Sequence, residues 1–230
     1  MAMRVSVPDA SWLDSLNDLG LGIDLLVWDT QGPQPEGDLD LVVWPYTLDP
    51  SAMASVDTSR VGVIQGQSLG FDGVAENLPA GGVFCNAIGV HEESTAELAV
   101  TLALASARRL DVFADQQSRG EWVKAFTSSL IDTRVLLLGI GGIGGEIVKR
   151  LDGFGCELTR VGTSARDDER GHVHATSELP QLLPRADVVI AAVPLTEQTT
   201  GLIDDDFLAA LPDDAIVVNV ARGKVADTDA

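Results

Sequence analysis

A glycine-rich turn between an apolar strand and a helix constrains the fold of this chain more than any other sequence feature. The glycines follow the pattern Gly-x-Gly-x-x-Gly, directly after the apolar run Val135–Leu138 and at the start of a helical pattern over residues 143–154. Glycine there permits a tight turn, a close approach of a ligand to the backbone and close packing of the helix on the strand. The helix N-terminus offers unpaired N–H groups to phosphate. We therefore predict a dinucleotide site formed by Gly139, Gly141, Gly142, Ile143 and Gly144, the alternative being a glycine-rich turn without a ligand.

Short β-rich runs alternate with helical patterns along the chain, which favours parallel sheets with helices on their faces. In the first ninety residues, strands are predicted at 4–7, 23–27, 41–44, 61–64 and 83–86. A helix over 11–19 has Ser11 as a candidate N-cap and Gly20 as a stop signal. Later strands are predicted at 135–138, 157–161, 187–192 and 215–220, with helices at 143–154, 178–184 and 204–211.

A long alanine-rich helix, predicted over residues 94–117, separates the two sets of strands. Ser94 and Glu97 have the spacing of a capping box at its start. We place a domain boundary near residue 95, which gives one domain over 1–95 and another over 96–230.

Composition excludes several classes of partner. The net charge of −20 disfavours nucleic acid, because phosphate backbones bind clustered Lys and Arg. The longest apolar runs fall short of the roughly 20 residues that span a bilayer, and the first residues lack a signal-peptide pattern. Cys85 and Cys156 each lie in an apolar segment and are interpreted as buried, reduced thiols. These features predict a cytoplasmic protein without membrane or nucleic-acid partners.

The end of the second strand of the glycine-turn unit indicates the type of dinucleotide. An NAD site carries an acidic residue there, which accepts hydrogen bonds from the ribose hydroxyls. This chain has Gly162 at that place, followed by Thr163, Ser164 and Arg166, whose guanidinium can pair with a 2′-phosphate. We predict NADP as the preferred cofactor, with NAD possible. The alternative is that Arg166 pairs with the acidic residues at 167–169.

A lone arginine follows another apolar strand, in the run from Val217 to Gly223. Arg222 in this position can contact the carboxylate or the carbonyl of a small acid, since a guanidinium has a fixed fork of donors. The alternative is a surface arginine paired with Asp227. Leu69 and Gly70 follow a strand in a loop whose N–H groups can hold an anion, or they form an ordinary turn.

Two of the three histidines, His172 and His174, are two residues apart and would face the same side of a strand, as a metal pair does. No Cys, Asp or Glu is suitably placed beside them in the sequence. We therefore predict no metal site.

Four segments together resemble the D-isomer-specific 2-hydroxyacid dehydrogenase family, most closely its glyoxylate/hydroxypyruvate reductase branch. The segments are Val63–Asp72, Asn86–Ala99, Pro194–Ile203 and Asn219–Gly223, in the family's order and spacing. The resemblance implies an α/β fold with a flavodoxin-like substrate domain and a Rossmann domain, whose doubly wound parallel sheet is incomplete. It implies NAD(P)H-dependent interconversion of a small 2-keto acid and its D-2-hydroxy acid.

The same resemblance assigns roles to residues. Leu69 and Gly70 would bind the substrate carboxylate through their N–H groups, and Arg222 would orient the keto acid and polarise its carbonyl. Thr95 would lie near the nicotinamide, with Pro194, Thr199 and Val220 also on the cofactor side. Family members usually pair through the long helix, which implies a homodimer.

The family completes its active site with a glutamate and a histidine after the arginine motif, whereas this sequence stops at Ala230. We expect a C-terminally truncated member of the family, which includes the case of an inactive fragment. The alternatives are a non-catalytic NAD(P)H sensor or regulatory protein, and a chain that a partner completes. Without a general acid, reduction should be slower by about 10²–10⁴-fold.

Overall fold

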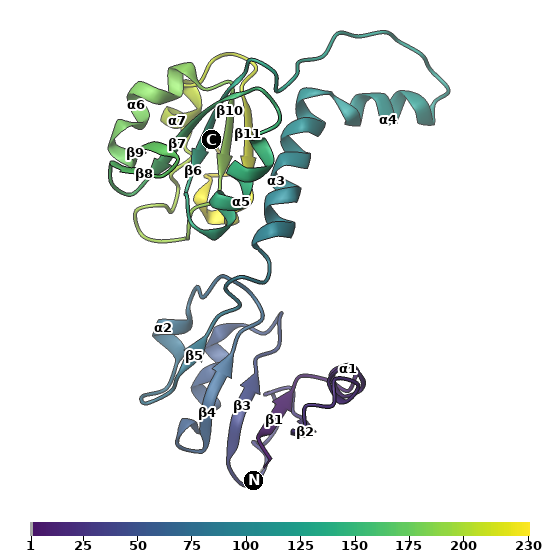
Figure 1. Cartoon of the computed structure of the whole chain (residues 1–230), viewed down its shortest axis with the longest axis vertical. Helices are drawn as coiled ribbons and strands as arrows, with labels where there is room; N and C mark the ends of the chain where they lie inside the picture. The colour runs from purple at the N-terminus through teal and green to yellow at the C-terminus, as the bar shows by residue number, and fades with distance from the viewer. Residues whose placement is uncertain (1) are drawn as a thin grey trace. The chain divides into compact units, whose positions relative to one another are not determined.

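A computed structural model, which describes residues 2–230, divides the chain into two compact units (Figure 1). Of the described residues, the first unit contains 2–91 and the second 92–230. The division falls between His91 and Glu92, and the domain boundary near residue 95 stays a prediction.

The first unit contains a five-stranded sheet in which all neighbouring strands are parallel. The strand order is β2-β1-β3-β4-β5, the order of flavodoxin-like folds. All five strands were predicted from the sequence, and no strand end is shifted by more than two residues. They are β1 (Arg4–Val7), β2 (Asp24–Val27), β3 (Leu39–Val43), β4 (Val61–Gln65) and β5 (Phe84–Cys85).

Short helical segments connect these strands: α1 (Ser11–Asn17), η1 (Pro50–Ser55), η2 (Thr58–Arg60) and α2 (Val74–Asn77). Ser11 is the first residue of α1 and does not cap it. Asp9 instead accepts hydrogen bonds from Ser11. The prediction of Ser11 as the N-cap was therefore wrong. Cys85 is exposed, which contradicts its prediction as a buried thiol, because it lies on the edge strand β5.

The second unit contains a six-stranded sheet in the order β11-β10-β6-β7-β9-β8. The five strands from β11 to β9 are parallel, and this is the Rossmann arrangement that the glycine turn predicts. The strands are β6 (Arg134–Leu138), β7 (Glu157–Gly162), β8 (Arg166–Asp168), β9 (Gly171–Ala175), β10 (Val188–Ala191) and β11 (Ile216–Asn219).

Helices cover both faces of this sheet. On one face, α3 (Glu92–Ala107) and α5 (Gly142–Leu151) pack on the buried side chains of Val135, Leu137 and Ile190. On the other face, α6 (Leu179–Leu182) and α7 (Asp205–Ala209) pack on Leu136, Leu138 and Val189. Two-sided coverage explains why the strands are almost continuously apolar rather than alternating.

The long helix differs from its prediction in two ways. Arg109 has a φ of 49°, and this left-handed residue ends α3 and begins α4 (Leu110–Ser118). The helix also begins at Glu92, so Ser94 lies within the first turn rather than at the cap. The apolar periodicity predicted a single helix. A residue with left-handed backbone angles that interrupts a helix can be anticipated from the sequence when it is glycine, but not when it is arginine.

The antiparallel hairpin of β8 and β9 was not predicted. Its turn is at residues 169 and 170, within a charged run that resembles a solvated loop in the sequence. Arg160 in β7 is buried and donates two hydrogen bonds of 2.8 Å to Asp168, which ties the hairpin to the sheet. The hydrogen bonds from Arg160, helped by its positive charge, hold the pKa of Asp168 below its usual value.

Within residues 2–230, no helix combines the length and the apolar composition needed to cross a membrane.

Candidate functional site

The predicted cofactor residues of the second unit lie in loops after neighbouring parallel strands. In the sheet, β7, β6, β10 and β11 are adjacent. The loops that follow their carboxyl ends contain, in the same order, Thr163, the glycine turn, Pro194 with Thr199, and Arg222. Carboxyl ends of parallel strands share one edge of the sheet, where open α/β folds bind ligands. The topology therefore brings these four loops to one edge.

The glycine turn has contacts that only glycine permits. Gly139 has a φ of 91°, and a Cβ there would lie 2.6 Å from the carbonyl oxygen of Ala192. A Cβ on Gly144 would lie 2.1 Å from the carbonyl oxygen of Gly139. The turn and the close helix–strand packing expected from these two residues are both present.

The middle of the turn is open at the N-terminus of α5. A Cβ at Gly141 would have no heavy atom within 4 Å, so a ligand can approach the backbone there. Gly142 and Ile143 begin α5, where the first N–H groups have no acceptor inside the helix. The arrangement suits a phosphate group.

Glu92 is a residue of this region that the sequence analysis did not assign to it. It is buried, and its Cγ would lie 2.8 Å from a Cβ on Gly142. The packing of α3 on α5 produces this contact. No local sequence signal could have revealed it, because the two residues are fifty positions apart.

After β7 the chain carries no acidic side chain at the expected place. Gly162 is buried, Thr163 and Ser164 are exposed, and the guanidinium of Arg166 lies beside Gly162, with Nη1 3.1 Å from the position of a Cβ. Nη1 donates a hydrogen bond of 3.2 Å to the carbonyl oxygen of Ser164.

The neighbouring acids have other partners. Asp167 lies 2.9 Å from His172, and Asp168 pairs with Arg160. The structure therefore does not support the alternative in which Arg166 forms an ion pair with these acids.

The loop after β10 is held by its own hydroxyl groups. The Oγ1 atom of Thr199 donates to the carbonyl oxygen of Pro194 at 2.6 Å and accepts from the N–H of Thr196 at 2.8 Å. Thr199 thus fixes the backbone between it and Pro194, while Pro194 is exposed.

The side chain of Asn219 organises the arginine loop after β11. It accepts from the N–H of Ala221 at 3.0 Å and donates to the carbonyl oxygen of Arg222 at 2.9 Å. Val220 donates to the carbonyl oxygen of Ala191, which joins the loop to β10. Arg222 is exposed, and its Nη1 donates to the carbonyl oxygen of Ala221.

In the first unit, the loop after β4 has its carbonyl groups occupied and its N–H groups available. Asn86 donates to the carbonyl oxygen of Leu69 and Ser68 to that of Gly70, both at 2.9 Å. Neither the N–H of Leu69 nor that of Gly70 donates a hydrogen bond within residues 2–230. Two adjacent free donors are what an anion requires.

Thr95 is half-buried in the first turn of α3, in the second unit. His91, in the first unit, contacts the carbonyl oxygen of Gln67 through Nε2 at 2.8 Å.

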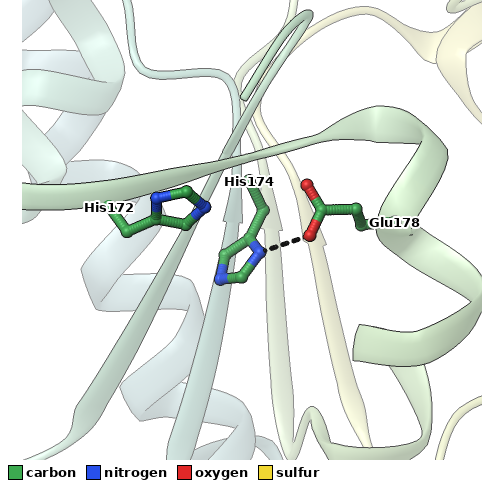
Figure 2. A group of neighbouring side chains, drawn as sticks. All are labelled: His172, His174 and Glu178. Carbon is green, nitrogen blue, oxygen red and sulfur yellow. Dashed lines mark hydrogen bonds and ion pairs between the residues drawn. The ribbon is translucent and has the colours of Figure 1, made fainter. Parts of the chain in front are cut away.

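The histidine pair on β9 has an acidic neighbour that the sequence analysis did not identify. His174 Nδ1 lies 2.8 Å from Glu178 Oε2, and the rings of His172 and His174 are 4.6 Å apart (Figure 2). Glu178 is four residues further along the chain, in η3 (Thr176–Glu178), and the turn from β9 into η3 returns it to His174. The premise that no acid lies near the pair was wrong.

The sequence matches the family described as D-isomer specific 2-hydroxyacid dehydrogenase, NAD binding domain, over residues 100–230. A glyoxylate reductase of Thermococcus kodakarensis is 32% identical over 184 residues, which are 74% of this chain and 55% of that protein. The chain thus spans about half the length of the curated relatives that it matches.

Solved structures share the fold. A D-isomer specific 2-hydroxyacid dehydrogenase from Xanthobacter autotrophicus Py2, in complex with NADPH and MES, superposes with a TM-score of 0.80 at 23% identity, over 99% of this chain and 75% of that one. A D-lactate dehydrogenase from Aquifex aeolicus, complexed with NAD and lactic acid, has a TM-score of 0.76 at 22% identity, over 100% and 71% of the two chains.

Proposed function

The chain belongs to the D-isomer-specific 2-hydroxyacid dehydrogenase family, and we propose that it binds NADPH in preference to NADH and acts on a small 2-keto acid. The single observation that carries the cofactor preference is the loop after β7. An arginine lies beside Gly162, where an NAD site has a carboxylate.

The proposed cofactor site follows the edge of the second sheet. The N–H groups at Gly141–Ile143 would bind the pyrophosphate, and the open backbone at Gly141 leaves room for it. Thr163, Ser164 and Arg166 would bind the 2′-phosphate, because a guanidinium and two hydroxyls give charge-assisted and neutral hydrogen bonds. Thr95, Pro194, Thr199 and Val220 are assigned to the remaining cofactor contacts by the family resemblance alone.

The substrate residues are proposed from donor chemistry. Leu69 and Gly70 present two free N–H groups, which suit a carboxylate. Arg222 presents a guanidinium, which suits a keto oxygen on which negative charge develops. Bound NADPH would supply the hydride for the carbonyl carbon. The chain's own contribution is to hold the acid and to stabilise the charge on its oxygen.

A glyoxylate- or hydroxypyruvate-like 2-keto acid is the proposed substrate class. The glyoxylate reductase from Thermococcus kodakarensis supports this choice, as its name states its substrate.

The proposed assembly is a homodimer formed through α3, α4 and the segment after them. In a single copy of the chain, several large apolar side chains of this region are exposed to solvent: Leu98, Leu102, Leu110, Trp122, Val123 and Phe126. Exposed apolar surface of this extent is typical of an interface. Analytical ultracentrifugation would test it, and a monomer at micromolar concentration would contradict it.

Calorimetric titration with NADPH and NADH tests the cofactor assignment. We expect tighter binding of NADPH, and Arg166→Ala should weaken it by about 10–100-fold, since a hydrogen bond to a charged group contributes roughly 1.5–3 kcal/mol. NADH should be nearly unaffected. Equal losses for both cofactors would contradict the role of Arg166, and binding of neither would contradict the site. Turnover with glyoxylate and hydroxypyruvate is then measured on the same preparation.

A further inference from the structure

A cluster of potential metal ligands lies outside the loops described above. One ligand atom from each of His172, His174 and Glu178 lies within 4.8 Å of the others, and Figure 2 shows the two rings and the carboxylate gathered at one place. Around a tetrahedral zinc ion, bonds of about 2.1 Å place two ligand atoms roughly 3.4 Å apart. The group therefore needs to contract by up to about 1.4 Å. His172 is exposed, so its side chain has room to move toward the other two.

The fold places the three side chains together for definite reasons. His172 and His174 alternate with the fully buried Val173 in β9, so they share the opposite face of the strand. Glu178 is held beside them by its Oε1 atom, which accepts from the N–H of Ala175 at 2.7 Å. Its position is therefore fixed by the backbone at the end of β9.

The cluster can be reached from solvent, since His172 is exposed and His174 and Glu178 are partly exposed.

Asp167 supplies the outer support that metal-binding histidines usually have. It pairs with His172 across the β8–β9 hairpin, and its Oδ1 atom lies 2.9 Å from His172 Nδ1. A carboxylate on one ring nitrogen fixes the ring and directs the other nitrogen to a metal. Asp167 is thus a positioning residue.

We propose that His172, His174 and Glu178 bind a divalent transition-metal ion of the zinc type. Two imidazoles and one carboxylate suit zinc, whereas magnesium and calcium prefer oxygen ligands throughout. Three protein ligands would leave a fourth position for water. The ion would tie β9 to η3 and, through Asp167, to β8.

Calorimetric titration of the full chain with ZnCl₂ tests the site, after removal of any histidine-bearing purification tag. We expect one saturable site per chain that a large excess of Mg²⁺ does not displace. Bound Co²⁺ should show the visible absorption of a four-coordinate ion. His174→Ala should weaken zinc binding by about 100-fold or more, and Asp167→Asn by about 10-fold with unchanged stoichiometry.

Two further variants keep the result interpretable. Glu178→Gln preserves the acceptor for the N–H of Ala175 and so should fold, yet it should lose binding like His174→Ala. His91→Ala removes the one histidine outside the cluster and should bind zinc like the wild type. The proposal is overturned by an absence of saturable binding, by displacement with Mg²⁺, or by equal affinity in wild type and Glu178→Gln. Circular dichroism verifies that each variant is folded.

Discussion

Two loops of this protein present backbone N–H groups after a parallel strand, but they are stabilised in different ways. The Gly139–Gly144 turn depends on missing side chains, because carbonyl oxygens occupy the space of a Cβ at Gly139 and Gly144. The loop of Leu69 and Gly70 is instead stabilised by side chains, since Asn86 and Ser68 donate hydrogen bonds to its carbonyl groups. A glycine pattern can be recognised in the sequence, whereas a hydrogen bond from a residue as far along the chain as Asn86 cannot.

The largest effect should come from filling the space at Gly144. Gly144→Ala puts a Cβ 2.1 Å from the Gly139 carbonyl oxygen, which is backbone and cannot rotate away. We expect a loss of about 3 kcal/mol in the free energy of unfolding and loss of NADPH binding, measured by urea titration and calorimetry.

The adjacent glycine is a matched control. A Cβ at Gly145 would meet nothing within 4 Å, and the residue lies inside α5. Gly145→Ala should therefore stabilise the protein by about 0.5–1 kcal/mol. Equal destabilisation by the two variants would show that the close contact at Gly144 is not what makes glycine necessary there.

An effect of intermediate size is expected at Gly162, where we propose that the absence of an acidic side chain favours NADPH. Gly162→Asp introduces the carboxylate of an NAD site. The nearest atoms to the new Cβ belong to the side chains of Arg166, Val173 and Ile140, at 3.1, 3.3 and 3.7 Å. The ratio of NADPH to NADH affinity should fall by about 30-fold, or roughly 2 kcal/mol. Gly162→Ala fills the same space without the charge and should leave the ratio unchanged.

A smaller effect is expected in the loop of the first unit. Asn86→Ala removes one hydrogen bond to the Leu69 carbonyl, which is worth about 1 kcal/mol. The amide of Ala87, which donates to the carbonyl oxygen of Ser68 in this loop, should exchange hydrogen faster by about fivefold, while NADPH binding stays the same. Unchanged exchange would mean that Asn86 does not hold this loop.

The smallest effect should come from acid titration of a pair at the opposite end of the second sheet. Asp187 precedes β10 and accepts from the backbone N–H of Arg134 at 2.8 Å and from its Nε at 2.9 Å. These bonds hold the pKa of Asp187 below its ordinary 3.8. Because the folded state lowers this pKa, the stabilisation is present above about pH 3.8 and is lost as the pH falls through the folded value.

Urea midpoints of wild type and Asp187→Asn should therefore differ at pH 6 and converge toward pH 3. Both partners are about one third exposed, so solvent screening keeps the difference small. A difference that persists unchanged at pH 3 would show that the carboxylate charge is not its source.

The sequence by itself determined where most of the strands lie along the chain and the position of the glycine turn. Buried apolar runs such as Val188–Ala191 and a Gly139 that must adopt a positive φ are local requirements, so they appear directly in the residues. The absence of an acid at Gly162 was equally visible.

Only the tertiary structure decided what the remaining side chains contact. Glu92 is buried against Gly142 because α3 packs on α5. Asp167 pairs with His172 because β8 and β9 form a hairpin, which the charged sequence there did not predict. Glu178 reaches His174 because the chain turns after β9. Such contacts depend on where distant segments meet, and a periodic pattern carries no information about that.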